Sequence, residues 1–325
     1  MTVLPLPSVL ASLRCRVALT CDDPVLRDHH VHGVRIMPGV TFLDMLWRIL
    51  AARGVEVGAI ELRRCVFRAP ASVDRARGRE LLFEIGEGRD GGQVIVRGRA
   101  QVAGDHASAS ALASALEAEP REHFVADLAS VAPLDPHARE QIGPRGPVVE
   151  AHELDQLYAM SRGLGTVHGP FMRGLGSLRE HADGLHAALE LGDEAAGHVD
   201  DFFLHPALLD CATLLPSIYF ARTAGTVAEP VIPVHIAAVR GFRRPRGRRC
   251  HVWVPRASCR VISSELSTAD LYLLDEDGEL LASLLGLSFK RVRERQLITR
   301  LEPDATPLEP SPAPAPAALD RKRVV

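Results

Sequence analysis

The segment DHHVHGVRIMPG, residues 28–39, lies between a short polar break and a long apolar run. It places three histidines beside Gly33, and its final Pro-Gly pair leads directly into the apolar run. Proline suits the first turn of a helix and Gly54 suits a C-terminal stop, so the pattern predicts a helix from Pro38 to about Arg53. Apolar residues cover most of its circumference, which is typical of a buried helix.

Strand patterns lie on both sides of this helix. One precedes it and others follow it before residue 132, so the first part of the chain should form a sheet wrapped around one helix. These strands are expected at residues 12–21, 57–68, 80–86, 93–102 and 123–131. The Ala/Ser/Glu-rich residues 104–121 are expected to form a loop or a short surface helix.

The same order recurs further along the chain. The turn sequence Asp275-Glu276-Asp277-Gly278 predicts a hairpin between the last two strands. Two apolar helices, each with its own strands, suggest an internal duplication, although the halves share little residue identity. The expected elements are a helix at 152–160, a glycine-rich loop at 163–176, strands within 177–191, an apolar helix at 207–220 interrupted by Pro216, and strands at 231–242, 249–254, 269–274 and 280–292.

The domain organisation follows from this repetition and from composition. Residues 1–131 are predicted to form an N-terminal unit and residues 151–295 a C-terminal unit. The Pro/Gly-rich residues 132–150 between them are typical of a linker. Residues 296–325 are rich in proline and alanine and are expected to be a disordered tail.

Composition excludes several classes of protein. With 46% apolar and 24% charged residues, the 325-residue chain can form a proper core. A net charge of −3 and an aromatic content of 5% argue against nucleic-acid binding. The six cysteines show neither Cys-x-x-Cys nor zinc-site spacing, which favours reduced thiols in a cytoplasmic protein. We expect neither a signal peptide, because no basic segment precedes the apolar N-terminal residues, nor a transmembrane helix.

His29 is the first candidate for chemistry. A neutral histidine exchanges a proton near pH 7 without much adjustment of its pKa, and N–H groups at the start of the following helix are free to polarise a carbonyl oxygen. Most lone histidines are nevertheless structural, and we interpret His30 and His32 in that way. The spacing of the three histidines matches no usual metal-ligand set, so no metal site is predicted.

Asp210 is the second candidate, within HPALLDCA at residues 205–212. A carboxylate inside an apolar helix is costly unless it is paired or protonated, and burial raises its pKa as a general acid requires. The alternative is an exposed position on that helix. A third segment, GTVHGPF at 165–171, is by itself only a glycine/proline turn.

Together these segments resemble the dehydratase domains of polyketide synthases, over about residues 3–293. The family motif His-x3-Gly-x4-Pro is matched by His29, Gly33 and Pro38, followed by the usual Gly39. The family segment His-Pro-x-Leu-Leu-Asp is matched at 205–210. The loop Tyr-Gly-Pro-x-Phe is matched in part by His168, Gly169, Pro170 and Met172. Residues 232–235 match the start of a family strand more weakly, and residues 273–278 and 284–292 look like the closing strand pair of such a domain.

The resemblance implies an α+β double hotdog fold, in which two antiparallel sheets each wrap around a central helix and one active site lies between the halves. The implied enzyme is a hydro-lyase of polyketide biosynthesis and secondary metabolism. It removes water from a β-hydroxyacyl thioester on an acyl carrier protein and leaves an α,β-unsaturated thioester. His29 would be the general base that removes the α-proton, and Asp210 the general acid that protonates the β-hydroxyl. The resemblance implies no metal and no cofactor besides the carrier's phosphopantetheine arm.

The sequence departs from the family at several positions. Leu214 stands where the family has Gln or His, four residues after the aspartate, and His168 and Thr166 stand where it has tyrosines. These departures leave open a catalytically degenerate scaffold, or a double-bond isomerase or oxa-cyclase on the same fold. The predicted substrate-binding residues are Gly33, Pro38, Gly39, His168, Gly169, Pro170 and Leu214.

The expected partner is an acyl carrier protein, with other polyketide synthase domains and a second copy of the chain as further candidates. Six arginines lie within Arg240–Arg249. Because carrier proteins are acidic, such a basic loop would steer docking. A solvated hairpin loop is the alternative interpretation of the same residues.

Overall fold

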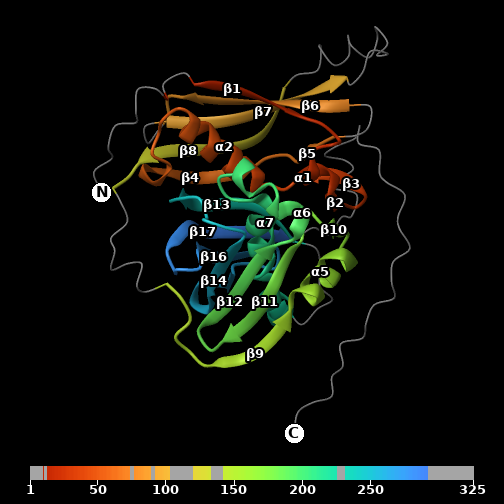
Figure 1. Ribbon diagram of the computed structural model, residues 1–325, viewed down its shortest axis with the longest axis vertical. Coiled ribbons are helices and arrows are strands. Elements are labelled where there is room, and N and C mark those ends of the chain that lie inside the picture. Colours follow the sequence, from red (N-terminus) through yellow and green to blue (C-terminus); the bar gives the residue numbers. More distant parts are fainter. Residues whose placement is uncertain are drawn as a thin grey trace.

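The computed structural model describes residues 10, 13–73, 77–88, 92–102, 120–132, 142–224 and 231–291. Most strands in these ranges join in one antiparallel sheet of 13 strands, which runs from one end of the molecule to the other (Figure 1). Its order is β1-β6-β7-β8-β4-β13-β17-β16-β14-β12-β11-β9, with β15 paired to β16. The first five strands come from the first half of the chain and the rest from the second.

The first half wraps its strands around α2 (Thr41–Ala52), as the sequence predicts. Helix α2 begins later than Pro38, because Pro38 and Gly39 form a turn in which the Thr41 N–H donates to the Pro38 carbonyl. Phe42, Leu43, Leu46, Trp47 and Leu50 of α2 are all buried. The other elements of the large sheet and its surroundings are β1 (Arg14–Leu19), α1 (Pro24–Arg27), a 3-10 turn (Val57–Ala59), β4 (Ile60–Phe67), β6 (Arg77–Gly86), β7 (Gly92–Val102) and β8 (Arg121–Ser130).

The second half wraps its strands around α7 (Pro206–Leu214). The predicted interruption of the 207–220 helix at Pro216 is confirmed: the helix divides there into α7 and α8 (Ser217–Ala224), because proline lacks an N–H for the helical ladder. The predicted hairpin is confirmed, with Gly278 at a positive φ of 80°. The remaining elements are β9 (Val148–Glu153), α5 (Leu154–Gly163), β11 (Gly174–His181), β12 (Gly184–Leu191), α6 (Asp193–Ala196), a 3-10 turn (Val199–Asp201), β13 (Val231–Gly241), β14 (Arg249–Pro255), a second 3-10 turn (Arg256–Ser258), β15 (Arg260–Val261), β16 (Leu266–Leu274) and β17 (Leu280–Arg291).

The two halves meet in two places. Strand β4 pairs with β13, so the two sheets continue into each other. A smaller sheet has the order β10-β2-β3-β5, formed by β2 (His29–Val31), β3 (Val34–Met37), β5 (Ala71–Ser72) and β10 (Thr166–His168). In it β10 of the second half pairs antiparallel with β2 of the first. This small sheet places the histidine segment beside the glycine/proline loop.

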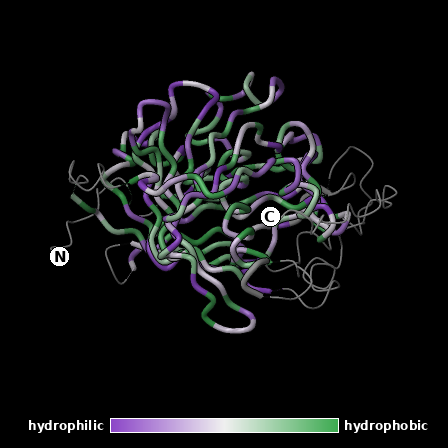
Figure 2. Tube along the Cα trace, turned by 90° about the horizontal axis from the view of Figure 1, so that it is seen from below, coloured by the Kyte–Doolittle hydropathy of each residue, from purple (hydrophilic) through white to green (hydrophobic). Residues whose placement is uncertain are grey.

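One hydrophobic core runs through both halves. Its members come from α2, α7 and the inner faces of the strands of both halves. Figure 2 shows apolar segments inside the molecule and polar ones at its edges. Trp47 of α2 packs against Phe203, which precedes α7, with ring centroids 5.4 Å apart. The predicted double hotdog fold is therefore present, with the two units fused through a shared core.

The structure describes only part of the predicted linker and none of the predicted tail. Residues 133–141 of the predicted linker and the predicted tail at 296–325 lie outside the described residues, as does most of the segment 104–121. Val148 to Glu150 belong to β9, so the prediction that 132–150 is entirely linker is wrong at its end. These residues pair with β11 at the edge of the sheet, and their side chains are nearly all exposed. The strand therefore lacks the alternation of apolar and polar residues by which a half-buried strand is recognised in a sequence. None of the helices in the described part of the chain has the length and apolar character needed to cross a bilayer.

Candidate active site

His29 opens strand β2 directly after the short helix α1. Its Nδ1 lies 2.5 Å from the carbonyl oxygen of Ile36 in β3. A carbonyl only accepts, so Nδ1 carries the proton and Nε2 keeps a free lone pair. The hairpin that joins β2 to β3 therefore fixes both the orientation and the tautomer of the proposed base. Gly33 serves this hairpin with a φ of 82°, a value that suits glycine at a two-residue turn.

Burial controls the charge of His29. The residue is 6% exposed, and loss of hydration lowers the pKa of His29 to about 4, although the charge of Asp210 acts in the opposite direction. At neutral pH the imidazole is therefore uncharged and able to accept a proton.

Asp210 lies in the second turn of α7. The helix begins at Pro206, and the Ala207 N–H donates to Nδ1 of His205, which caps the helix. Asp210 is 9% exposed, so the alternative of an exposed helix position is wrong. The apolar residues around it pack into the shared core, and the carboxylate faces the small sheet that carries His29.

His168 joins these two residues. The β10–β2 register places His168 directly opposite His29, and their ring centroids are 5.3 Å apart. Nε2 of His168 lies 2.8 Å from Oδ2 of Asp210. One nitrogen or oxygen from each of His29, His168 and Asp210 lies within 4.8 Å of the other two. Residues from β2, β10 and α7 thus form one buried polar cluster.

The pKa of Asp210 differs from the sequence-based expectation. Burial raises this pKa, but the hydrogen bond from His168 and the interaction with His29 outweigh burial, so the pKa of Asp210 lies below its ordinary value. The prediction that burial alone would keep this carboxyl protonated is therefore wrong. The sequence could not show that a histidine 42 residues away donates to it.

The three groups border one cavity of about 190 Å³. Apart from them, its walls are mostly apolar and include Met37, Phe42 and Phe67. Four of the predicted substrate-binding residues also line it: Pro38, Gly39, His168 and Leu214. The cavity lies between the two halves, with walls from the histidine segment, β10, α7 and the start of β13.

Gly33, Gly169 and Pro170 are not among the described residues that line this cavity. Their roles are in the backbone around it. Gly169 donates its N–H to the carbonyl of Asp28, and a Cβ there would lie 2.6 Å from the Asp28 carboxyl carbon. The geometry gives no support for direct substrate contacts by these three residues.

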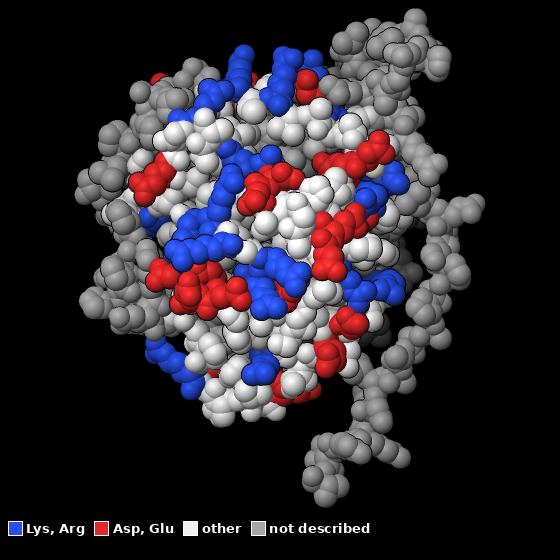
Figure 3. Space-filling view, in the orientation of Figure 1, with Lys and Arg blue, Asp and Glu red and all other residues white. Residues whose placement is uncertain are grey.

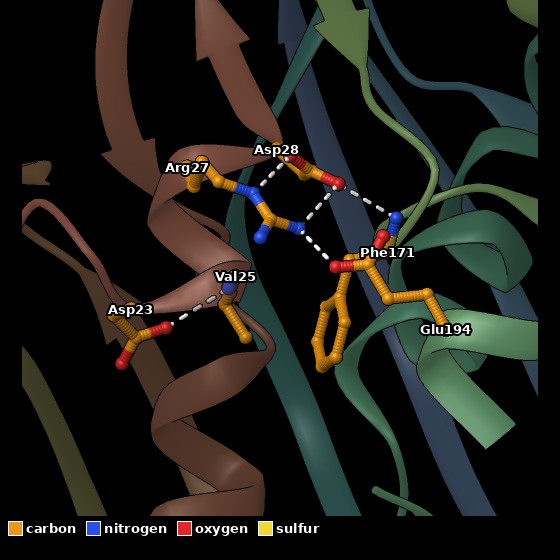
Figure 4. A network of polar contacts seen from close by, with 6 residues as sticks. All are labelled: Asp23, Val25, Arg27, Asp28, Phe171 and Glu194. Atoms are coloured by element: carbon orange, nitrogen blue, oxygen red, sulfur yellow. Dashed lines mark hydrogen bonds and ion pairs between the residues drawn. The ribbon is translucent and has the colours of Figure 1, made fainter. Parts of the chain in front are cut away.

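Asp28 is a residue whose role the sequence analysis missed. Its carboxylate accepts the Phe171 N–H at 2.6 Å and pairs with Arg27, which also reaches Glu194 (Figure 4). These contacts join the segment before His29 to the loop after His168. The sequence signal that could have revealed this role was the position of Asp28 directly before His29. A carboxylate that is buried there needs hydrogen-bond donors from a neighbouring segment.

Tyr158 of α5 is a second missed residue. Its ring meets the His168 ring edge-on, with centroids 5.1 Å apart, and its hydroxyl accepts the Gly174 N–H at 2.8 Å. His168 therefore packs between the rings of His29 and Tyr158. Nothing in the helical pattern around Tyr158 distinguishes it from an ordinary core residue.

The cluster of His29, His168 and Asp210 has the donor types and spacing that a divalent metal ion accepts. In the structure two of these three groups, His168 and Asp210, are hydrogen-bonded to each other. Glu150, His152 and Glu180 form a second such group at the sheet edge, where Glu180 also pairs with Arg256. The expectation of metal-free chemistry stays a prediction.

The arginines within Arg240–Arg249 have polar partners in the structure. Arg240 is buried and donates to the carbonyls of Gly58 and Ala132 at 2.8 and 2.6 Å. Four others form ion pairs: Arg243 with Asp275, Arg246 with Asp277, and both Arg248 and Arg249 with Glu190. Figure 3 shows positive and negative side chains interspersed over the face it views. The structure gives no support to carrier docking at this loop.

Two fused hotdog units bring a buried histidine and a buried aspartate, two groups that can exchange protons, to one cavity, and this arrangement defines the double hotdog class. Comparison with known proteins agrees. A family model described as the polyketide synthase dehydratase N-terminal domain matches residues 135–298, just over half of the chain. A second, described as the polyketide synthase dehydratase domain, matches residues 7–99. The chain belongs to the polyketide synthase dehydratase family.

Individual relatives cover most of this chain. It is 28% identical over 85% of its length to polyketide synthase GfsE of Streptomyces halstedii, and 23% identical over 89% to polyketide synthase PksL of Bacillus subtilis. It spans only 7% and 6% of the length of those two synthases. An N-terminal dehydratase from the difficidin assembly line has a similar structure, with a TM-score of 0.76 and 26% identity over 90% of this chain and 98% of that one. The CurJ dehydratase of the curacin synthase, at 14% identity over 91% of this chain and 95% of that one, shares the fold with a TM-score of 0.71.

Proposed function

We propose that this chain removes water from a β-hydroxyacyl thioester carried by an acyl carrier protein and forms an α,β-unsaturated thioester during polyketide synthesis. The observation that carries the proposal is the convergence of His29 and Asp210, from opposite halves of the chain, on one mostly apolar cavity. Membership in the polyketide synthase dehydratase family supports the same reaction.

The residues divide the reaction between a base and an acid. Neutral His29 takes the α-proton through Nε2, and Asp210 gives a proton to the departing β-hydroxyl. Gly39 lines the cavity just ahead of α2. The first N–H groups of α2, those of Thr41, Phe42 and Leu43, already donate to the carbonyls of Pro38, Gly39 and Val40, so the donor to consider is the N–H of Gly39 itself. An N–H in this position would polarise the thioester carbonyl and make the α-proton more acidic.

The wider setting is proposed on the same basis. The substrate arrives on the phosphopantetheine arm of a carrier protein, and the chain works beside other polyketide synthase domains in the cytoplasm. No metal or redox cofactor takes part in an elimination driven by two proton transfers. Treatment with a chelator should therefore leave the rate unchanged, and a loss of activity that zinc restores would contradict this part of the proposal.

The direct test is incubation with a 3-hydroxyacyl carrier protein, followed by mass spectrometry of the acyl arm. A mass loss equal to one water molecule is expected, and no loss with acyl groups of several chain lengths would refute the proposal. The alternatives need a carrier-bound enoyl group as substrate: a shifted double bond at unchanged mass would identify an isomerase, and with an enoyl group that carries a further hydroxyl, a new ring at unchanged mass would identify a cyclase.

Variants locate the reaction at the proposed site. His29→Ala and Asp210→Asn should each reduce kcat by about 10²-fold or more, because each removes one proton-transfer group. His30→Ala is the matched control, since His30 is the next residue along β2 but does not line the described cavity. Equal losses in all three variants would indicate a general folding defect.

A further inference from the structure

Helix α7 does not itself provide a polar neighbour for the carboxylate of Asp210. Leu214, one helical turn later, lines the cavity with an apolar side chain. The Thr213 hydroxyl donates to the backbone carbonyl of Asp210, at 2.8 Å, rather than to its carboxylate. Among the described residues, the hydrogen bond to this carboxylate comes from His168 of β10.

His168 is held firmly for this contact. Its backbone is fixed by the pairing of β10 with β2, and its side chain is 1% exposed. The rings of His29 and Tyr158 pack edge-on against it, at 5.3 and 5.1 Å between centroids. A side chain packed on both sides loses little further entropy when it orients a partner.

The tautomer of His168 follows from its surroundings. Its Nδ1 is buried and has no hydrogen-bond partner among the described residues. An orphaned N–H is rarer and more costly than an under-used acceptor, so the proton belongs on Nε2. His168 then donates to Oδ2 of Asp210, and the other carboxyl oxygen is the one left to carry the acid proton.

We propose that His168 is the positioning residue for Asp210 and takes the place of the polar group that Leu214 lacks. It holds Oδ2, so that Oδ1 delivers its proton to the substrate. This inference rests on the proposed dehydration. In this chain the polar partner of the Asp210 carboxylate therefore comes from β10, whereas position 214 on α7 carries an apolar side chain.

The proton balance of one turnover is closed within the cluster. His29 Nε2 takes the α-proton, the electrons of that bond form the double bond, and the bond from the β-carbon to oxygen breaks. The departing oxygen takes the proton of Asp210 and leaves as water. The proton on His29 then returns to Asp210, which lies within 4.8 Å of it. His168 keeps its own proton throughout.

The test compares substitutions at positions 168 and 214 in the full chain with a 3-hydroxyacyl carrier protein. His168→Phe should lower kcat about 10²-fold, the typical cost of a misplaced reacting group, with little change in KM. His168→Gln, which keeps a donor, should retain most of the activity. Adding Leu214→Gln to His168→Phe should restore kcat at least about tenfold, because residues 210 and 214 are neighbours on one helix face.

A pH profile separates orientation from mere packing. Loss of the His168 donor removes a cause of the low Asp210 pKa, so the alkaline limb of kcat/KM should move to higher pH in His168→Phe. An inactive wild-type protein would refute the proposed dehydration itself. An active wild type with an equally active His168→Phe would overturn only the role of His168. A loss in His168→Phe that Leu214→Gln does not rescue, with an unmoved pH profile, would also overturn it.

Discussion

At the scale of single residues, the site depends on how two ordinary titrating groups are changed by their neighbours. His29 is desolvated and fixed in one tautomer by the Ile36 carbonyl, so it is a base at neutral pH. Asp210 is equally buried, yet His168 and His29 stabilise its ionised form. At neutral pH His29 is therefore able to accept a proton, and in the proposed reaction Asp210 must gain a proton before it can donate one.

These pKa directions predict an unusual pH dependence. Between about pH 8 and pH 6, kcat/KM should rise as pH falls, because a larger fraction of Asp210 carries the required proton. The rate should decline only near the His29 pKa of about 4, where the base itself becomes protonated. Initial rates in overlapping buffers would measure this profile. An acid limb centred near 6.5 would show that His29 is not desolvated in solution.

At the scale of elements, the loops around His29 and His168 are held together by Asp28. This carboxylate connects α1 of the first half to the loop after β10, through the Phe171 N–H. Its geometry aligns β2 with β10 and so sets the distance between the base and the His168–Asp210 pair. Because the contact joins residues 143 positions apart, it has no local signal in the sequence.

Replacing Asp28 should affect both stability and rate. Asp28→Ala leaves the buried Phe171 N–H without an acceptor, which should cost about 1–3 kcal/mol, and kcat should also fall. Thermal unfolding and steady-state kinetics measure the two effects. Asp23→Ala is the matched control, because Asp23 caps α1, with a hydrogen bond from the Val25 N–H, and makes no contact with the loop after β10 among the described contacts (Figure 4). It should cost about 1 kcal/mol without changing kcat. An unchanged kcat in Asp28→Ala would contradict the alignment role.

Asp44 connects α2 to the segment before α7. It is fully buried and accepts the N–H groups of Phe203 and Leu204 at 2.7 and 3.0 Å. Burial raises the pKa of Asp44 to about 6. A carboxyl with a raised pKa in the folded state binds more protons there than in the unfolded chain, so it stabilises the fold less as pH rises from about 4 to 6.

Asp44→Asn should remove this dependence, since the amide oxygen still accepts both N–H groups and cannot ionise. Relative to wild type, the free energy of unfolding of the variant should increase by roughly 2 kcal/mol between pH 4 and pH 7. Denaturant titrations at several pH values provide the measurement. A difference that stays constant with pH would mean that Asp44 keeps an ordinary pKa.

At the scale of the whole molecule, the two hotdog units are not separate bodies. The pairing of β4 with β13 makes one continuous sheet, and Ile236 of β13 and Cys65 of β4 are both fully buried at this junction. The active site uses residues from both units. Separation would expose two long strand edges and open the cavity.

The full chain should therefore unfold in a single cooperative transition, with the same midpoint by circular dichroism and by tryptophan fluorescence, since Trp47 and Trp253 report on different halves. Residues 1–132 and 142–325 expressed separately should not fold, whereas together they should recover activity. Two separate transitions in the full chain, or a stable isolated half, would contradict a shared core.

The sequence by itself predicted the central helices and most strands of the large sheet, and it singled out His29 and Asp210 as the candidate proton-transfer residues. Apolar periodicity predicted α2 and most strands, because these patterns are local, and the motifs around His29 and Asp210 have a fixed spacing. It also predicted the break at Pro216 and the hairpin at residues 275–278, since proline and glycine act on their own backbone.

Only the tertiary structure decided how these parts meet. The β10–β2 register, the Asp28 contact and the bond from His168 to Asp210 join residues that are far apart in the sequence. For the same reason the pKa of Asp210 and the polar partners of the arginines within Arg240–Arg249 could not be predicted, because both depend on which groups fold next to them. The periodicity of apolar residues along the sequence determines which face of a helix or strand is buried. Which element packs against that face depends on the tertiary packing of the whole chain.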